Sequence, residues 1–484
     1  MPIAAATRDD GLWSPERRLL SAGLVLTITL VAFEALAVST VLPIVAIDLG
    51  GLELYGWVIS MFYLGSLIGI AVVGGVVDRG TLGRPFAIGL SLFGLGLLIG
   101  GLAPSTPVLI AARFVQGLGA GTIPPIAYVA IGRSLPETLR PRMFATLSTA
   151  WILPGVIGPV LAGLVGETLG WRYVFLGLLP FIALAGVLTH HAIASVRVPD
   201  ATAADEHAAG TASRRRLPFA FLVSLGAGLL MAGLSLGDLV ATLALVALGL
   251  LVGLPALHRL TPSGTLTARP VLPAAILLRG VLTCAFFGVD AYVTLTLEEW
   301  RGLSAIAAGV VLTAATLSWT AGSWIQARNA VRWPTRHFVR AGFFVVVVGL
   351  ALFSLILLPD VPVWLAIPTF AVAGLGMGLA YAPLALIVLR EAPAASQGSA
   401  SSALWVMDTL GTIIGIGIAG AIVAASLRSS GEAGPGLAVA FAIAVLVGAG
   451  GLALTGRLRV ARPAVDFGRP EPPTPGAAPR PQEV

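Results

Sequence analysis

Long apolar segments alternate with short polar segments along almost the whole chain. Each apolar segment spans about the 20 residues that an α-helix needs to cross a bilayer, whereas the short alternating strands of a transmembrane barrel are absent from the pattern. The apolar segments form a group of six, a pair and a second group of six, at residues 19–44, 54–77, 85–103, 107–132, 143–166, 173–195, 217–236, 239–257, 271–297, 303–327, 340–358, 362–389, 398–426 and 436–456. The sequence therefore predicts an all-α polytopic membrane protein with 14 transmembrane helices.

The composition supports this interpretation. Of the 484 residues, 57% are hydrophobic and only 11% are charged, and the mean hydropathy is +0.95. A soluble globular protein carries about a quarter of its residues as charges. This chain has about half that share, so it cannot cover its own surface with charged groups in water, and a soluble protein is excluded.

The arginine residues predict the orientation in the membrane. All 29 basic residues are Arg, and the net charge of +6 could by itself indicate a nucleic acid or another anionic partner. With the N-terminus in the cytoplasm, however, only Arg172, Arg301 and Arg428 fall outside and Arg113 and Arg279 fall within spans, which leaves 24 of the 29 in cytoplasmic segments. This bias is the usual topology signal of membrane proteins. It predicts a multi-pass protein of a bacterial inner membrane with both termini in the cytoplasm.

The same pattern predicts how the chain is divided. Residues 196–216 are polar and rich in Ala, which indicates a linker, and residues 457–484 are rich in Pro and Arg with little that could pack, which indicates a disordered tail. The predicted parts are a cytoplasmic N-terminal tail at 1–18, a six-helix bundle at 19–195, a cytoplasmic linker at 196–216, two extra transmembrane helices at 217–258, a second cytoplasmic linker at 259–270, another six-helix bundle at 271–456 and the disordered cytoplasmic tail at 457–484.

Two spans carry motifs of small and polar residues. The fourth span contains Arg113-Phe-Val-Gln-Gly-Leu-Gly-Ala-Gly, in which Arg113 and Gln116 share a helical face. A guanidinium at that depth must face protein or a water-filled cavity. In the fifth span, small residues form rows that favour a close-packed helix interface and a kink at the proline. These rows contain Gly155, Pro159 and Gly163, with Gly158 and Ala162 beside them.

These motifs resemble those of the major facilitator superfamily. The fourth span is similar to the R-x-x-Q-G-x-G pattern of that family, and the fifth is similar to the G-x-x-G-P-x-x-[AG]-G pattern of its antiporter branches. The loop after the second span resembles the family's signature loop but has two extra residues; its matching positions are Gly74, Asp78, Arg79, Gly83 and Arg84. Glu34 lies nine residues before Pro43, where fourteen-span drug/proton antiporters have an Asp.

The resemblance implies a fold and a mechanism. It implies a major-facilitator fold of two six-helix bundles with two extra central spans outside that core and with substrate bound near the midplane. It also implies that the loop containing Asp78 and Arg79 is a conformational gate, although a solvated turn remains the alternative. Gly155, Gly158, Pro159 and Gly163 then form the antiporter motif.

Three acidic residues lie well inside predicted spans. They are Glu34, Asp290 and Asp408. A carboxylate at the bilayer centre costs roughly 2.5–3.5 kcal/mol, and desolvation favours its protonated form. Such a group releases its proton when it meets water, so we predict proton coupling through these acids, and the resemblance implies that Arg113 takes part in it. The alternative for each is a structural role, in which the acid is protonated or paired with Arg and ties helices together.

Other polar and aromatic residues could contact a substrate. We predict that Gln116, Trp151, Tyr292 and Trp405 line a lipophilic cavity, and simple packing is the alternative for the aromatic residues. The five His residues lack metal-ligand spacing, and a chain without Lys cannot form a phosphate-binding Gly-Lys-Ser or Gly-Lys-Thr loop. We therefore expect no enzyme activity, no cofactor, no metal and no use of ATP, so an ion gradient must supply the energy.

The sequence as a whole predicts a secondary active transporter that exports drugs or other lipophilic small molecules in exchange for protons by alternating access. The expected partners are a small-molecule substrate, protons and the lipid bilayer, without nucleic acid, and the expected state is a monomer. One alternative keeps the fold but exports a self-made lipid or secondary metabolite. Another is a membrane sensor or assembly subunit that does not transport.

Overall fold

A computed structural model describes residues 11–50, 54–79, 81–194, 196 and 203–459. Within these ranges the regular secondary structure is helical throughout, and 14 helices are long and apolar enough to cross a membrane. The predicted all-α fold with 14 spans is therefore confirmed, and the chain is a multi-pass membrane protein. Most predicted ranges lie within a few residues of the helices, because continuous apolar runs of this length leave little ambiguity.

The first group of spans contains α1 (Arg18–Leu49), α2 (Tyr55–Arg79), α3 (Gly83–Gly101), α4 (Thr106–Ser134), α5 (Arg140–Thr149) with α6 (Ile152–Val165) and the π-helical turn η2 (Gly166–Gly170), and α7 (Arg172–Leu176) with α8 (Leu179–Ala194). We call this group the N bundle. The two extra spans are α9 (Ala203–Ser235) and α10 (Leu239–Leu260).

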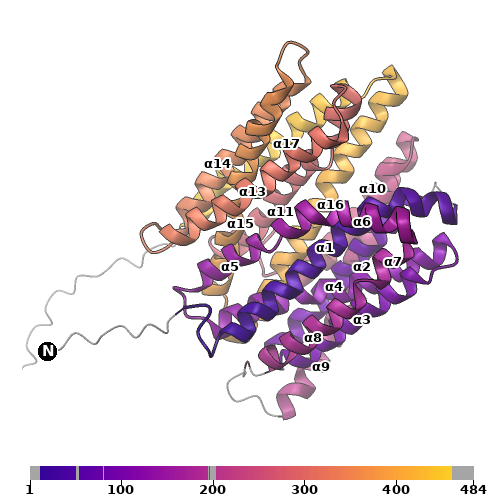
Figure 1. The fold of residues 1–484 in the computed structure, drawn as a ribbon. Coiled ribbons are helices and arrows are strands. Elements are labelled where there is room, and N and C mark those ends of the chain that lie inside the picture. The colour runs from indigo at the N-terminus through magenta and orange to yellow at the C-terminus, as the bar shows by residue number, and fades with distance from the viewer. Residues whose placement is uncertain (1–10, 51–53, 80, 195, 197–202, 460–484) are drawn as a thin grey trace, which may run out of the picture.

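The last group, the C bundle, contains α11 (Leu272–Asp290) with α12 (Val293–Leu295) and η3 (Thr296–Trp300), α13 (Ala305–Asn329), α14 (Thr335–Ser354) with η4 (Leu355–Leu357), η5 (Val363–Leu365) with α15 (Ala366–Glu391), η6 (Ala394–Ser396) with α16 (Gln397–Ser430), and α17 (Gly434–Leu454) with η7 (Thr455–Leu458). Figure 1 shows the indigo-to-magenta N bundle below the salmon-to-yellow C bundle, with α5, α11 and α16 between them.

One domain boundary differs from the predicted one. Helix α9 begins at Ala203, inside the segment 196–216 that we predicted to be a linker, so its first turns belong to the helix. Alanine has the highest intrinsic helix propensity, and an Ala-rich polar segment next to an apolar run can extend that helix. The predicted tails lie mostly outside the described residues, at 1–10 and 460–484.

Glycine residues allow neighbouring helices within each bundle to approach closely. A Cβ at Gly117 of α4 would lie 2.1 Å from the Phe62 carbonyl oxygen of α2, and a Cβ at Gly378 of α15 would lie 2.0 Å from the Trp319 carbonyl oxygen of α13. Neither position can hold a larger residue unless the helices separate. Small residues at helix contacts are the usual means of tight packing in membranes. Both bundles use this device, so the helices within each are tightly packed.

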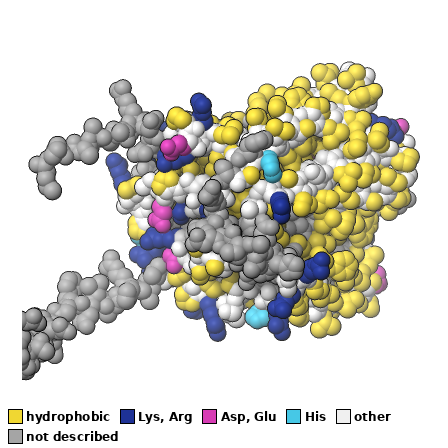
Figure 2. All heavy atoms as spheres, turned by 90° about the horizontal axis from the view of Figure 1, so that it is seen from below, with side chains coloured by type: hydrophobic (Ala, Val, Ile, Leu, Met, Phe, Trp, Pro, Cys, Tyr) yellow, Lys and Arg dark blue, Asp and Glu magenta, His cyan; other side chains and the backbone are white. Residues whose placement is uncertain are grey.

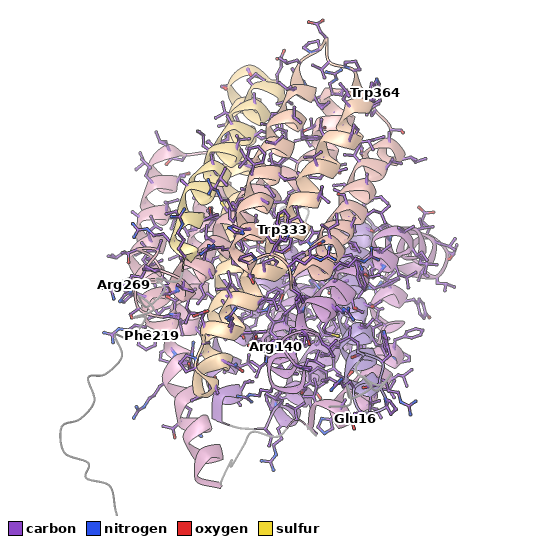
Figure 3. All side chains as sticks on the ribbon, turned by 90° about the vertical axis from the view of Figure 1, so that its left-hand side faces the viewer. Glu16, Arg140, Phe219, Arg269, Trp333 and Trp364 are labelled. Atoms are coloured by element: carbon purple, nitrogen blue, oxygen red, sulfur yellow. The ribbon has the colours of Figure 1, made fainter. Side chains whose placement is uncertain are left out.

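The two ends of the helices differ in charge. We call the end at which α1 begins and α17 ends the termini face, and the other end the opposite face. Arg133, Arg328 and Arg390 lie in the last turns of helices that end at the termini face. Figure 2 shows Arg side chains gathered on one side of the molecule, next to a broad hydrophobic surface. Trp364 of η5, which is 66% exposed, lies at the far tip of the C bundle from Arg140 and Arg269 (Figure 3). An apolar belt between such ends is the surface expected in a bilayer.

Candidate functional site

A buried ion pair links the first and fourth spans. The Nη1 of Arg113 in α4 donates a hydrogen bond of 2.5 Å to Oε1 of Glu34 in α1, and the two side chains are 6% and 0% exposed. The same Nη1 donates to Oε1 of Gln116 at 2.6 Å, and the Arg113 Nε donates to the Val58 carbonyl at 3.3 Å. The guanidinium also lies 4.3 Å from the centre of the Phe62 ring. Arg113 is therefore held by three helices.

This pair leaves polar atoms without partners. Within the described residues, Oε2 of Glu34 and Nε2 of Gln116 are buried and have no hydrogen-bond partner. An unsatisfied buried polar atom is costly, and its presence calls for an explanation such as a bound proton or water. A proton on Oε2 of Glu34 would remove the negative charge that holds Arg113 in place. The arrangement can therefore exchange an ion pair for a protonated acid.

A second buried ion pair lies in the C bundle. The Nε of Arg279 in α11 donates to Oδ1 of Asp408 in α16 at 2.6 Å, and these side chains are 0% and 10% exposed. Arg279 also donates to the backbone carbonyl of Tyr381 in α15, and its guanidinium lies 3.0 Å from the centre of the Tyr381 ring. The sequence placed both residues inside spans but gave no sign that they are paired. Asp408 has a structural role at the least.

The second pair reaches across to the N bundle. The Nη2 of Arg279 donates to the hydroxyl oxygen of Tyr128 in α4 at 3.2 Å. The rings of Tyr128 and Tyr381 both contact Trp405, with centroids 5.3 Å and 6.5 Å from its ring. This aromatic cluster surrounds the guanidinium and joins the two bundles near the termini face. The contact between Tyr128 and Arg279 has no signal in the sequence.

Asp290 differs from the other two acids. It lies at the end of α11, is only partly buried, and has no recorded hydrogen bond or ion pair within the part of the chain that the structure describes. Arg279 and Thr283, which lie on the same helix, both bond to Asp408 instead. Asp290 therefore offers a carboxylate that is not already neutralised by Arg.

The predicted gating loop lies partly at the contact between the bundles. Asp78, near the end of α2, accepts hydrogen bonds from the backbone N–H of Gly398 at 2.6 Å and of Ser399 at 3.1 Å, and from the Ser399 hydroxyl. These N–H groups belong to the first turn of α16, where backbone N–H groups have no acceptors within their own helix. A carboxylate there is favoured by the helix dipole. Gly74 allows the approach, since a Cβ on it would lie 2.5 Å from Cβ of Ser402.

The other residues of the loop are not at this contact. Gly83 is the first residue of α3 and packs within the N bundle, where its Cβ would lie 2.9 Å from Cβ of Ala194. Arg84 is exposed. The side chain of Arg79 lies outside the described atoms. A basic residue from elsewhere is present instead, since Arg216 of α9 donates to the Ser399 hydroxyl. Arg216 falls at the end of the predicted linker 196–216, and no motif in the sequence indicated this contact.

The small residues of the fifth span face different surroundings along their length. Gly158 faces α1, with Cβ of Leu36 3.8 Å from where its own Cβ would be, and Ala162 is 2% exposed. Gly155, nearer the termini face, would place a Cβ 3.8 Å from Thr316 of α13, whereas a Cβ at Gly163 would meet no heavy atom within 4 Å. The row containing Gly158 thus lies against α1, but a Cβ at Gly158 would make only ordinary van der Waals contacts, so the close approach that we predicted is not required there. The row containing Gly155, Pro159 and Gly163 contacts α13 only near the termini face.

All hydrogen bonds recorded between the two bundles in the described ranges lie in the half nearer the termini face. Besides those at Asp78 and Tyr128, Ser323 of α13 donates to the Ser148 hydroxyl of α5 at 3.1 Å, and Trp324 donates to the Thr149 hydroxyl at 3.0 Å. The bundles are therefore closed against each other at the termini face. A transporter must break these bonds to open that face.

The four residues predicted to line a cavity lie in different surroundings. Gln116 is fully buried and belongs to the Arg113 network, and Trp405 belongs to the aromatic cluster around Arg279. Tyr292 donates to the Ile416 carbonyl at 3.2 Å. Trp151 is 42% exposed at the start of α6. Among the described residues no group of three or more His, Cys, Asp or Glu side chains could hold a metal ion.

The chain is similar to known transporters. A sequence model of the Major Facilitator Superfamily matches residues 24–416. The chain is 28% identical over 466 residues to a probable multidrug-efflux transporter of Mycobacterium tuberculosis, an alignment that covers 91% of this chain and 95% of the relative. It is 25% identical over 426 residues to the multidrug transporter protein MdtP of Bacillus subtilis, covering 84% and 75% of the two chains.

Solved structures have the same fold. The human organic anion transporter MFSD10 superposes with a TM-score of 0.66 at 14% identity, covering 91% of this chain and 99% of that one. The proton:xylose symporter XylE superposes with a TM-score of 0.63 at 14% identity, covering 89% and 94%. Both likenesses show the arrangement of two bundles.

Proposed function

This chain belongs to the Major Facilitator Superfamily, and from this premise we propose that it exports lipophilic small molecules in exchange for protons. Members of this family are membrane transporters for small molecules and are not enzymes. This chain is likewise a transporter and not an enzyme. The relatives in Mycobacterium tuberculosis and Bacillus subtilis are named as multidrug transporters, which supports drug-like substrates. Since both are named as transporters, a sensor without transport activity is not favoured.

The buried pair of Glu34 and Arg113 carries this proposal. In the paired state the carboxylate is ionised and holds the guanidinium against Gln116. Protonation of the unpartnered Oε2 neutralises Glu34 and leaves Arg113 with only neutral acceptors. Each proton that binds to Glu34 or leaves it therefore changes the free energy of the contact between α1 and α4. The size of the change is that of a buried ion pair. Breaking such a pair by losing one partner costs about 3–5 kcal/mol, which is enough to shift a conformational equilibrium.

The contacts between the bundles support the direction of this cycle. The hydrogen bonds between the bundles in the described ranges all lie towards the termini face, so we assign the structure to a state that opens towards the opposite face. The gathering of Arg at the termini face supports a cytoplasmic position for it, and hence an inner membrane with both termini inside. Protons then reach Glu34 from outside. Substrate release to the outside precedes the return to the inward-facing state.

Asp290 is our candidate for a substrate contact. Its carboxylate lies in a span without a neutralising Arg, and a positively charged lipophilic molecule can supply the missing charge. In the absence of such a molecule, a proton can do the same. Competition between the two for one carboxylate is a direct means of exchange. The partners that this mechanism requires are a substrate, protons and the bilayer, with no ATP, and one copy of the chain contains both bundles.

Proton movement in everted vesicles tests the proposal. Vesicles that contain the protein are energised with a proton gradient, and the addition of a transported lipophilic dye should cause a proton leak. Glu34→Gln should abolish this leak while the protein level in the membrane stays unchanged. Glu432→Gln is the matched control, because Glu432 is exposed in the loop between α16 and α17. A leak in Glu34→Gln equal to that of the control would refute proton coupling through Glu34.

A further inference from the structure

The first extra helix lies against both bundles. Among the helices of the two bundles, α9 packs mainly on α2 and also contacts α16, so it covers the line along which these two helices meet. The Ser224 hydroxyl donates to the Leu64 carbonyl of α2 at 2.9 Å. Towards the opposite face, the Leu234 side chain lies 3.0 Å from where a Cβ on Gly417 of α16 would be. In contrast, α10 presents most of its surface outward, and its Leu239, Val240 and Leu251 side chains are each more than 70% exposed.

At the termini face, α9 contributes a charged side chain to the contact between the bundles. Arg216 lies one turn before Phe219, which is labelled in Figure 3 on the same flank as Arg269. Its Nη1 donates to the Ser399 hydroxyl, and the Ser399 hydroxyl donates in turn to Oδ2 of Asp78. Its Nη2 donates to the Leu260 carbonyl at the end of α10 at 3.0 Å. Arg216 thus connects α9, α10, α16 and, through Ser399, α2.

We propose that the two extra helices hold the termini face closed, and that Arg216 is the positioning residue through which they do so. The role concerns the conformational equilibrium and not the substrate or the coupling ion. Since it deals with a part of the chain outside the two bundles, it goes beyond the proposed function. It depends on the alternation between states that is common to the family.

The negative charge on Asp78 explains how Arg216 stabilises the closed termini face. Asp78 is 8% exposed, and the bonds that it accepts come from uncharged donors of α16. A buried carboxylate is costly unless a positive charge lies near it. Arg216 supplies one through Ser399, and Arg133 of α4 supplies another near the end of α2, where it donates to the Val77 carbonyl at 3.0 Å. Arg133 remains with the N bundle when the face opens, but the chain through Ser399 must break.

The placement of Arg216 makes its effect specific to one state. When the bundles separate at the termini face, α16 moves away from α2 and carries Ser399 with it. Arg216 stays anchored to the end of α10, where a cation is favoured by the negative end of the helix dipole. The closed state thus has a hydrogen-bonded chain of cation, hydroxyl and carboxylate that the open state lacks. Loss of Arg216 should therefore favour opening without changing either bundle.

Spin-label distances measure this equilibrium directly. In a Cys284→Ser background, labels at Glu137→Cys and Glu391→Cys report on the termini face, because both residues are exposed at that face and belong to different bundles. With the full chain in lipid nanodiscs, Arg216→Ala should raise the ratio of open to closed populations by roughly tenfold, equal to about 1.4 kcal/mol. Arg215→Ala, which changes an exposed neighbour, should leave the ratio unchanged.

Two further variants separate this role from simple helix stability. Ser399→Ala breaks the chain while leaving Arg216 on α10, and it should also favour the open state. In an Asp78→Asn background, Arg216→Ala should change the ratio by less than about twofold, because the charge it serves is gone. If Arg216→Ala does not fold, Ser399→Ala decides the matter. Distance distributions of Arg216→Ala and Ser399→Ala that match Arg215→Ala would overturn the proposal. None of these measurements depends on proton coupling or on transport.

Discussion

The pair of Glu34 and Arg113 leads to a quantitative prediction about stability. Glu34→Gln keeps the shape of the side chain but leaves a guanidinium that is 6% exposed without its counter-charge. Removing one partner of a buried pair costs about 3–5 kcal/mol. The bond to Gln116 at 2.6 Å, the bond to the Val58 carbonyl at 3.3 Å and the Phe62 ring at 4.3 Å remain. We therefore expect Glu34→Gln to lower the free energy of unfolding by about 3 kcal/mol, near the lower end of this range.

Removing the other partner of the pair, Arg113, should lower the free energy of unfolding by less. Arg113→Gln leaves a carboxyl group that can take up a proton and become neutral, so only its hydrogen bonds are lost, at about 1–3 kcal/mol. The double variant contains two amides that can bond to each other. Its loss should therefore be smaller than the sum of the two single losses by about 2 kcal/mol, which lies within the range for residues in direct contact.

Reversible unfolding in mixed detergent micelles, followed by tryptophan fluorescence, measures these differences. The chain has 10 Trp residues and needs no added probe. The control pair Glu432→Gln and Arg428→Gln removes exposed charges from the opposite face and should be close to additive. If the losses of Glu34→Gln and Arg113→Gln add to within about 0.5 kcal/mol, the two charges do not interact, and the coupling mechanism loses its basis.

Three other predictions concern the contacts between the bundles. Gly74→Val should prevent closure of the termini face, because even a Cβ would lie 2.5 Å from Ser402, and spin-label distances across that face should lengthen. Tyr128→Phe should shift the same distances towards the open state, since it removes a bond to a charged group worth about 1.5–3 kcal/mol. Asp408→Asn should lower the unfolding free energy by about 3–5 kcal/mol, because Arg279 is fully buried and loses its partner.

The fold could be predicted from the sequence because apolar length is a local signal. Fourteen runs of sufficient length defined 14 helices, and the positions of Arg defined two faces. Helix α9 nevertheless begins earlier than the predicted span, because a polar Ala-rich segment has no apolar pattern from which to read a helix. The motif around Arg113 also indicated that its guanidinium faces protein or a water-filled cavity inside the membrane.

The pairing of charges could not be predicted. Glu34 and Arg113 are 79 residues apart, and Arg279 and Asp408 are 129 apart, so nothing in the local pattern indicates that they meet. From the sequence, all three buried acids were predicted to have the same role. The structure separates them, since Glu34 and Asp408 are paired with Arg, whereas Asp290 has no such pair within the described residues. Which acid is neutralised depends on how helices are placed around each other, which is information that no single span contains.

The position of α9 has a consequence for how this protein can be inhibited. Because α9 forms the bilayer-facing side of the contact between α2 and α16, the gate can be reached from the hydrocarbon phase without entering the substrate path. A hydrophobic compound that wedges between α9 and α2 from the lipid side would change the rate of opening and not the affinity for substrate. Such an inhibitor would act non-competitively, and broad substrate tolerance would offer no protection against it.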